Sequence, residues 1–276
     1  MKSDLKLRSN SKINLGLWIK EKRPDNYHEI ETIFYENNDL YDEVEIKIEN
    51  SKNEKESSLD VSFIQKELSD TILLKKNLAY KAARLFFDKL GVKVNCNITI
   101  NKMIPLEAGL GGGSSNAACV LKGLNQMFDH KLHNTELLTI ASQIGSDVPF
   151  FILGKTCFGK GKGEILTPLE NSLKLEIKVV KPENIAISTK WAYEQIDNRE
   201  FISDHKTDIN NLILAMKKGD SDLFFKNTFN DFEMVAFSYY PQLVKERKKL
   251  LDEGYKTIHL CGSGSAIFGI KELSIR

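Results

Sequence analysis

The segment from Pro105 to Ala118, which reads PLEAGLGGGSSNAA, restricts the fold of this chain more than any other feature. An apolar strand pattern at 92–100 precedes it, and apolar residues at helical spacing follow it from Ala117 to Phe128. Each glycine costs roughly 0.5–1 kcal/mol of backbone entropy relative to alanine. Such a dense cluster therefore indicates that a ligand approaches the backbone. The glycines are Gly109, Gly111, Gly112 and Gly113.

This order of strand, glycine loop and helix is suited to binding an anion. Glycines allow several backbone N–H groups to approach a phosphate, and a helix N-terminus adds unpaired donors and a partial positive charge. Ser114 and Ser115 can cap the helix, contact phosphate oxygens or bind a metal ion. The alternative is a flexible turn followed by an ordinary serine cap. No Walker A lysine follows the glycines, and Ser114 replaces the last glycine of a dinucleotide-binding GxGxxG motif.

Alternation and helical spacing predict the other elements. The first segment alternates, so Lys12 and Asn14 share one face of a strand. Helices are predicted at 78–90 and from a cap at Asn134 to a stop before Gly145, and an apolar strand at 148–153. Strand patterns at 44–48 and 61–64 flank a polar stretch, 49–58, which predicts an exposed hairpin.

Composition excludes several classes of protein. The chain has 276 residues, 41% of them hydrophobic, and 39 Lys and Arg against 38 Asp and Glu, a net charge of +1. It therefore has a full core and no charge surplus that would favour nucleic acid or an anionic membrane. No apolar run approaches the roughly 18 residues of a membrane span, and no signal peptide is evident, so we expect a cytoplasmic protein. The four cysteines are far apart among apolar neighbours, which predicts buried thiols.

The glycine segment resembles the phosphate-binding motif of the GHMP kinases. Further blocks agree with that family: SKINLGLWIKEKRPDNYHEIETIF, IGSDVPFFILGKTCFGKGKGE, NDFE (Asn230 to Glu233) and LCGSGSAIFGI. They occur in the family's order and span nearly the whole chain. The triple glycine and the YHE block are most similar to those members whose acceptor is a cytidine-diphosphate-linked polyol in isoprenoid precursor synthesis. One departure is Glu107, where the family usually has a small residue.

The resemblance implies an α+β, two-domain GHMP kinase fold. Residues 1–159 would form an ATP-binding domain like ribosomal protein S5 domain 2, and residues 160–276 a ferredoxin-like domain. The implied cofactors are ATP and Mg²⁺, with Ser115 as a candidate metal ligand, and the chain is expected to be a monomer or a weak homodimer. The residues expected to bind the ATP phosphates are Pro105, Gly109, Leu110, Gly111, Gly112, Gly113, Ser114, Ser115 and Asn116. Lys102 and Pro105 are the candidates on the adenine side.

The resemblance also implies a catalytic pair, Lys12 and Asp147. In this family the aspartate of the DVPFF block lies against the acceptor hydroxyl and the lysine of the first strand lies beside it. Without the resemblance, Asp147 could equally be a turn carboxylate that caps backbone N–H groups, and Lys12 a lysine of an edge strand that reaches solvent.

The acceptor-binding residues are also assigned by resemblance. Tyr27 would stack on the cytosine, His28 would hydrogen-bond its edge, and Tyr193 would close the other side where the family often has Phe. Thr189 and Asn14 would line the acceptor site. The turn of Gly262, Ser263 and Gly264 would close the site near the phosphates, although a tight hairpin turn explains these residues equally well.

Two alternatives stand beside this hypothesis. One is a GHMP kinase for another small alcohol, such as mevalonate or homoserine. The other is a catalytically silent relative that binds a nucleotide or sugar and acts as a regulator, which would be expected to lack Lys12 or Asp147.

Overall fold

The computed structural model describes residues 3–50, 57–71, 73–198 and 208–273. The chain divides into two compact units, each assembled from separate segments. The first unit comprises Met1–Ser11, Asn38–Ile104 and Gly111–Gly154, and the second comprises Lys12–Asn37, Pro105–Leu110 and Lys155–Arg276. The division at residues 159 and 160 stays a prediction, because the compact units are not continuous stretches of chain.

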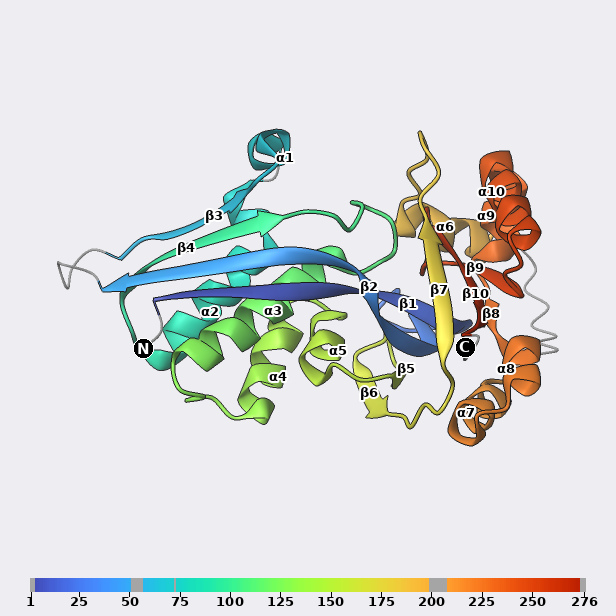
Figure 1. Ribbon diagram of the computed structural model, residues 1–276, viewed down its shortest axis with the longest axis horizontal. Helices are drawn as coiled ribbons and strands as arrows, with labels where there is room; N and C mark the ends of the chain where they lie inside the picture. The colour runs from blue at the N-terminus through green and yellow to red at the C-terminus, as the bar shows by residue number, and fades with distance from the viewer. Residues whose placement is uncertain (1–2, 51–56, 72, 199–207, 274–276) are drawn as a thin grey trace. The chain divides into compact units, whose positions relative to one another are not determined.

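The first unit is a sheet with helices packed on it. Its strands follow the order β3-β4-β2-β1, and β1 and β2 are long strands that continue into the second unit. Figure 1 shows α2, α3 and α4 on one side of these strands. The elements are β1 (Asp4–Lys22), β2 (His28–Asn50), β3 (Leu59–Phe63), α1 (Lys66–Thr71), the 3₁₀ helix η1 (Leu74–Lys76), α2 (Leu78–Leu90), β4 (Val94–Asn101), α3 (Gly112–Met127), α4 (Asn134–Ile144) and α5 (Val148–Leu153).

Alternation along the strands builds the core of this unit. Val44, Ile46 and Ile48 of β2 are buried, as are Ile98 and Ile100 of β4, while the intervening residues are polar. Helix α3 lies so close to the sheet that a Cβ at Gly123 would approach Ile46 and Leu7 to 2.7 Å. This glycine inside a helix therefore serves close packing and not flexibility.

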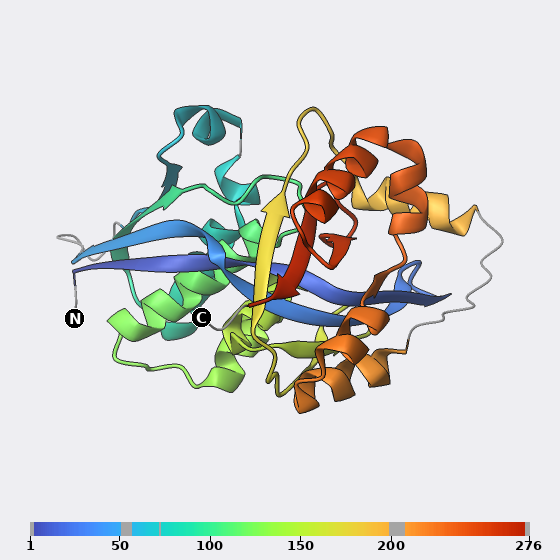
Figure 2. The same ribbon diagram turned by 45° about the vertical axis from the view of Figure 1, so that its right-hand side comes forward.

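The second unit contains the remaining parts of β1 and β2 together with a separate antiparallel sheet, β7-β10-β9. Strand β8 pairs in parallel with β1, and β5 pairs with β2. Figure 2 shows β7 and β10 side by side. The other elements of the second unit are β5 (Cys157–Lys160), β6 (Ile165–Pro168), β7 (Leu175–Val180), α6 (Thr189–Asp197), α7 (Ile209–Lys218), α8 (Ser221–Asn227), β8 (Phe229–Asn230), α9 (Glu233–Tyr239), α10 (Pro241–Asp252), β9 (Thr257–Leu260) and β10 (Ile267–Glu272).

The core of the second unit joins β1 to the three-stranded sheet and its helices. Leu17 of β1, Leu260 of β9, Ile267 of β10 and Leu243 of α10 belong to one buried cluster. Complete burial of such a side chain contributes about 1.5–3 kcal/mol, so this cluster supplies much of the stability of the unit.

The predicted hairpin between residues 44–48 and 61–64 is wrong. Strand β2 pairs antiparallel with β4 from Glu43 to Asn50, and β3 pairs in parallel with β4 on its other side. A parallel pair requires a crossover connection, which α2 provides here. Residues 51–56 of the expected hairpin tip lie outside the described part of the chain.

The predicted strand at 148–153 is also wrong, since this segment is helix α5. Short apolar runs do not distinguish a buried strand from a buried helix. Pro149 is in the first turn, where its missing N–H costs nothing, and Gly154 ends the helix at φ +59°. Helix α2 has the predicted bounds. Helix α4 begins at Asn134, but its cap is His133, whose N–H donates to Glu136 (3.0 Å).

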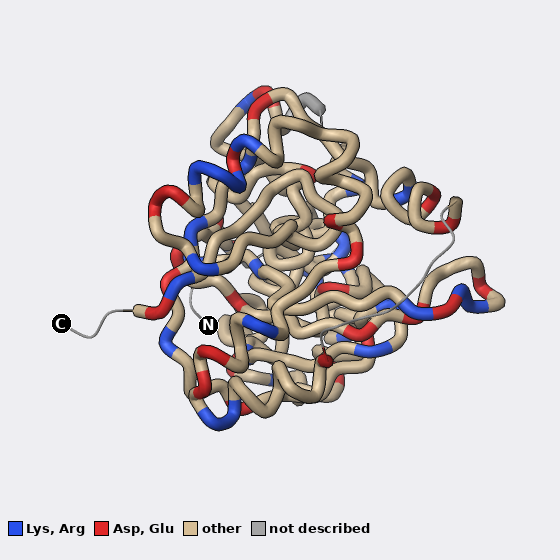
Figure 3. The backbone as a smooth tube through the Cα atoms, turned by 90° about the vertical axis from the view of Figure 1, so that its right-hand side faces the viewer, with Lys and Arg blue, Asp and Glu red and all other residues tan. Residues whose placement is uncertain are grey.

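The four cysteines are buried free thiols, as predicted. Burial raises the pKa of Cys157 to about 11 and that of Cys96 to about 12, so both are uncharged at neutral pH. No helix within the described residues is long and apolar enough to cross a membrane. Figure 3 shows Lys and Arg interspersed with Asp and Glu along the chain.

One buried carboxyl predicts how stability varies with pH. Burial raises the pKa of Asp231 from 3.8 to about 6, although the Ile19 N–H donates to its Oδ2 (2.6 Å). Between about pH 4 and 6 the native state holds a proton that the unfolded state has lost, so stability falls as pH rises through this window.

We expect Asp231→Asn to flatten this dependence and to raise the free energy of unfolding at pH 7 by on the order of 1–3 kcal/mol. Urea unfolding from pH 4 to 8 measures it, with the exposed Asp60→Asn as control. A wild-type profile that the substitution leaves unchanged would contradict the expectation.

Candidate active site

The first turn of α3 presents unpaired backbone donors. The helix begins at Gly112, its N-cap Gly111 has φ +69°, and no side chain caps it. The Ser115 N–H makes the first helical bond, to the Gly111 carbonyl (2.8 Å). The N–H groups of the preceding residues therefore have no helical acceptor, and the helix dipole adds positive potential at the same end. The serine cap considered from the sequence is absent, and this turn is suited to an anion.

A buried ion pair lies beneath this turn. Lys102 Nζ and Asp42 Oδ2 are paired, and their side chains are 5% and 0% exposed. A Cβ at Gly112 would approach Lys102 Nζ and Ile104 Cγ2 to 3.0 Å, so the ammonium lies close under the helix N-terminus and glycine leaves it the most room. The Lys102 side chain is thus buried in the interior of the first unit.

The same carboxylate organises the chain that leads into the glycine loop. Asp42 Oδ1 accepts from the N–H groups of Met103 and Ile104 (2.8 Å each), and Oδ2 accepts from Asn116 Nδ2 (2.9 Å). Both oxygens of this buried carboxylate therefore have hydrogen-bond partners. It fixes both the approach to the loop and the first turns of α3.

The two loop serines differ in environment. Ser115 is 3% exposed and its Oγ lies 2.7 Å from Ser9 Oγ, whereas Ser114 is partly exposed. Glu107, the departure from the family pattern, is exposed with φ +51°. Its carboxylate faces solvent.

In the second unit, β1 brings Lys12 and Asn14 together as alternation predicts. Lys12 Nζ donates to Asn14 Oδ1 (2.8 Å), and Asn14 Nδ2 donates to Thr32 Oγ1 (2.8 Å). Thr32 in turn donates to the Gly16 carbonyl (2.7 Å). Lys12 is only 5% exposed, so it is not an edge lysine that reaches solvent.

The turn at residues 261–264 packs backbone against backbone on the segment before the glycine loop. A Cβ at Gly109 would lie 1.6 Å from the Cys261 carbonyl oxygen, so only glycine fits there. A Cβ at Gly262 would lie 3.6 Å from Lys12 Nζ. Ser263 Oγ lies 2.9 Å from Thr189 Oγ1. The second unit thus places Gly262 beside Lys12 and Asn14, and joins Ser263 to Thr189.

The predicted aromatic residues adopt an arrangement that sequence reasoning did not specify. The His28 ring stacks on Tyr193 (centroids 4.9 Å apart, 8° between planes), and His28 Nε2 lies 2.8 Å from Asp197 Oδ1. Tyr27 is 59% exposed, with Lys162 Nζ 4.4 Å from its ring centroid.

Asp197 is a residue that the sequence analysis missed. Its pKa is lowered by the hydrogen bond from Lys22 and also by the charge of His28. It follows Tyr193 by four residues on α6, which places both on one helix face. That spacing was the available signal.

Asp147 occupies the N-cap position of α5 in the first unit. Its backbone is in the right-handed helical region (φ −84°, ψ −13°), and its side chain makes no capping hydrogen bond. The capping role considered from the sequence is therefore not observed. Lys12 belongs to the other unit, and the pairing of these two residues stays a prediction.

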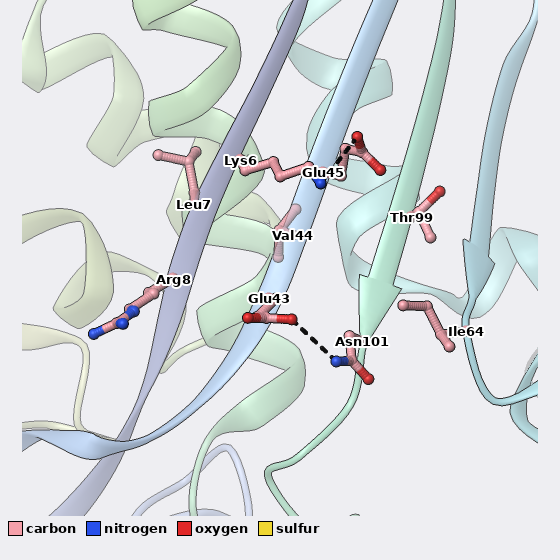
Figure 4. Close-up of a pocket in the computed structure, with 9 residues that line it drawn as sticks. All are labelled: Lys6, Leu7, Arg8, Glu43, Val44, Glu45, Ile64, Thr99 and Asn101. Carbon is pink, nitrogen blue, oxygen red and sulfur yellow. Dashed lines mark hydrogen bonds and ion pairs between the residues drawn. The ribbon is translucent and has the colours of Figure 1, made fainter.

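A hollow of about 330 Å³ on the first unit involves none of these residues (Figure 4). It lies over the polar side of β1, β2 and β4. Lys6 pairs with Glu45 (3.7 Å) and Asn101 donates to Glu43 (3.1 Å), so four of its polar side chains bind one another. We assign it no ligand.

Comparisons with known proteins show which family the chain resembles. Residues 77–155 match the family model described as GHMP kinases N terminal domain. The chain is 37% identical over 264 residues to the 4-diphosphocytidyl-2-C-methyl-D-erythritol kinase of Caldicellulosiruptor saccharolyticus, covering 96% of this chain and 87% of that protein. It is 38% identical to the enzyme of that name from Petrotoga mobilis, covering 96% and 98%.

Solved structures of two kinases have a similar fold. A crystal structure of 4-(cytidine 5'-diphospho)-2C-methyl-D-erythritol kinase superposes with a TM-score of 0.76 at 30% identity, covering 96% of this chain and 89% of that one. Homoserine kinase from Cytophaga hutchinsonii superposes with a TM-score of 0.74 at 17% identity, covering 99% and 86%, and shows a shared fold. The predicted α+β fold of the GHMP kinases is confirmed.

The buried pair under the loop makes a prediction about stability. Lys102→Met leaves the Asp42 carboxylate buried without its counter-ion, and we expect it to cost about 3–5 kcal/mol. The double variant Asp42→Asn/Lys102→Met removes both charges and should recover about 1–3 kcal/mol of the sum of the single losses. Denaturant unfolding measures the cycle. The exposed pair Lys248 and Asp252 is the control, with an expected coupling below about 1 kcal/mol; equal coupling in the two cycles would contradict the prediction.

Proposed function

This chain belongs to the family of 4-diphosphocytidyl-2-C-methyl-D-erythritol kinases, and we propose that it transfers the γ-phosphoryl group of ATP to the 2-hydroxyl of 4-diphosphocytidyl-2-C-methyl-D-erythritol, a step in non-mevalonate isoprenoid precursor synthesis. The observation that carries the proposal is the glycine turn at the start of α3, with its unpaired N–H groups. The similarity in sequence to kinases of that name extends over 96% of the chain.

The ATP phosphates bind at the first turn of α3. Gly112, Gly113 and Ser114 offer N–H groups, and the absence of any side-chain cap leaves these groups for an anion. The Lys102 ammonium lies beneath the turn, where it is paired with Asp42 and donates to Asn116 Oδ1 (3.3 Å). Pro105, Gly109 and Leu110 lead the backbone into the loop, and the Lys12 N–H donates to the Leu110 carbonyl (3.0 Å).

In the chemical step, Asp147 accepts the proton of the acceptor hydroxyl and Lys12 neutralises negative charge on the transferring phosphoryl group. Phosphoryl transfer requires mainly positioning and charge neutralisation, and these groups supply both. The bond from Lys12 Nζ to Asn14 keeps the ammonium in one direction, which supports its role.

The cytidine of the acceptor binds among Tyr27, His28 and Tyr193, with Asn14 and Thr189 nearer the hydroxyl. Stacking of a base on an aromatic ring contributes about 1–3 kcal/mol. Since His28 covers one face of Tyr193 in this structure, the base either stacks beyond His28 or replaces it on that ring.

Magnesium is expected to enter with ATP, where it neutralises phosphate charge. Among the described residues, no group of three or more His, Cys, Asp and Glu could hold a metal ion. The Ser115 hydroxyl is buried against Ser9. Phosphate oxygens and water are therefore the main ligands in our proposal, a common arrangement for Mg²⁺.

The alternatives have weaker support. A kinase for mevalonate or homoserine is supported by fold similarity alone, at 17% identity or below. A silent regulator would be expected to lack Lys12 or Asp147, and the chain has both. Buried free thiols suit a reducing compartment, which supports a cytoplasmic location.

Asp147→Asn tests the assigned base. The amide cannot accept the proton, so turnover should fall by about 10² or more while the affinity for ATP stays nearly unchanged. Coupled ADP release and nucleotide titration measure the two quantities. The exposed Asp222→Asn is the control, and turnover of Asp147→Asn at the wild-type rate would remove this residue from the mechanism.

A panel of acceptors tests the substrate. We expect ADP release from ATP and magnesium to depend on 4-diphosphocytidyl-2-C-methyl-D-erythritol and not on 2-C-methylerythritol 4-phosphate, mevalonate or homoserine. Turnover of another alcohol would replace the acceptor assignment, and no turnover with any of them would favour the silent regulator.

A further inference from the structure

The segment Asn230 to Glu233 (NDFE) has no role in the function described so far. It follows directly on the parallel pairing of β8 with β1, in which Asn230 is opposite Leu17. The Asp231 N–H donates to the Leu17 carbonyl (3.1 Å), and the Ile19 N–H donates to Asp231 Oδ2 (2.6 Å). The segment is therefore fixed to β1, the strand that also carries Lys12 and Asn14.

The Asn230 side chain connects this strand to the turn at residues 261–264. Its Nδ2 donates to the carbonyls of Leu260 (3.0 Å) and Gly262 (2.9 Å), and its Oδ1 accepts from the Phe232 N–H (3.0 Å). The residue is 1% exposed, so water does not compete for these bonds. Glu233 Oε1 accepts from the Leu260 N–H (3.0 Å), which holds the same backbone from its other polar group.

The residues of the turn do not fix its conformation by themselves. Gly262 has φ +58° and Gly264 has φ +96°, and glycine changes its backbone angles at low steric cost. The peptide group between Gly262 and Ser263 is planar and trans, so its C=O and N–H point in opposite directions. A bond to the Gly262 carbonyl therefore also determines where the Ser263 N–H points.

The orientation of this peptide matters for Lys12 and Asn14. A Cβ at Gly262 would lie 3.6 Å from Lys12 Nζ and 3.7 Å from Asn14 Oδ1. Rotation of the peptide would reverse its dipole beside an ammonium group assigned to the transferring phosphoryl group. It would also disturb the contact of the turn with Gly109, whose Cβ position lies against the Cys261 carbonyl.

We propose that Asn230 is a positioning residue for phosphoryl transfer: its amide holds the carbonyls of Leu260 and Gly262, and so keeps the 261–264 turn in one orientation against Lys12 and Asn14. Asn230 acts through the turn and does not contact the reacting atoms. The catalytic part of this inference rests on the proposed function, whereas the structural part does not.

Asn230→Asp is the main test. Aspartate has the same shape, but its carboxylate cannot donate the two hydrogen bonds and repels the two carbonyl oxygens instead. Asn230→Ser is the milder variant and retains one hydroxyl donor. The control is Asn227→Asp in the same unit, where a buried amide (6% exposed) donates to the Leu223 carbonyl (2.8 Å).

Two measurements are made on the full chain. Amide hydrogen exchange of a peptide that covers residues 260–265 should be about 10-fold faster or more in Asn230→Asp and unchanged in Asn227→Asp. The turnover number with ATP and the acceptor should fall about 10-fold or more, with the KM of the acceptor within about threefold of wild type and Asn230→Ser intermediate.

Unchanged exchange in the turn would overturn the proposal, and so would an equal loss of turnover in Asn227→Asp. Faster exchange with wild-type turnover would overturn the positioning role. If Asn230→Asp does not fold, Asn230→Ser decides by the same two criteria. Absence of wild-type activity with the acceptor would instead refute the proposed function, while the exchange rates still test the hold of Asn230 on the turn.

Discussion

Glycine at position 109 permits the backbone contact on which the arrangement of the second unit depends. The Cys261 carbonyl oxygen occupies the volume that any Cβ at this position would need. Because the two backbones touch, the segment before the glycine loop and the 261–264 turn have a fixed spacing. The Lys12 N–H bonds to the Leu110 carbonyl at the end of that segment, so β1 follows the same spacing. A methyl group at residue 109 would separate three pieces of chain that are distant in sequence.

Polar groups under the first turn of α3 have a comparable role in the first unit. Burial of a charge is costly unless it is paired and hydrogen-bonded, and Asp42 meets both conditions through Lys102, Asn116 and two backbone N–H groups. The network leaves the donors of the helix start unused. The buried network holds the first turn of α3 in place, and no side chain caps its N–H groups. Such a helix N-terminus can bind an anion at little further cost in conformational entropy.

The two units show the same principle in different forms. Glycines allow two backbone segments to come close together, and hydrogen bonds from buried polar side chains fix the orientation of those segments. Asn116 and Asp42 orient the first glycine segment, and Asn230 and Glu233 orient the turn after β9. Asparagine suits this purpose because its amide both donates and accepts hydrogen bonds.

Several helices and strands, and the family, follow from the sequence alone. The density of glycine before an amphipathic helix indicated a phosphate loop, and alternation put Lys12 and Asn14 on one face, because both signals depend on near neighbours in the chain. It did not determine that 148–153 is a helix, since a short apolar run fits either structure, nor that β4 separates β2 from β3, since pairing depends on distant residues. Tertiary structure alone decided that Lys102 is buried with Asp42, that Asp197 reaches His28 and that Asn230 holds the second glycine turn. These contacts join residues tens to hundreds of positions apart, and a side chain's partner across such separations depends on how the whole chain packs.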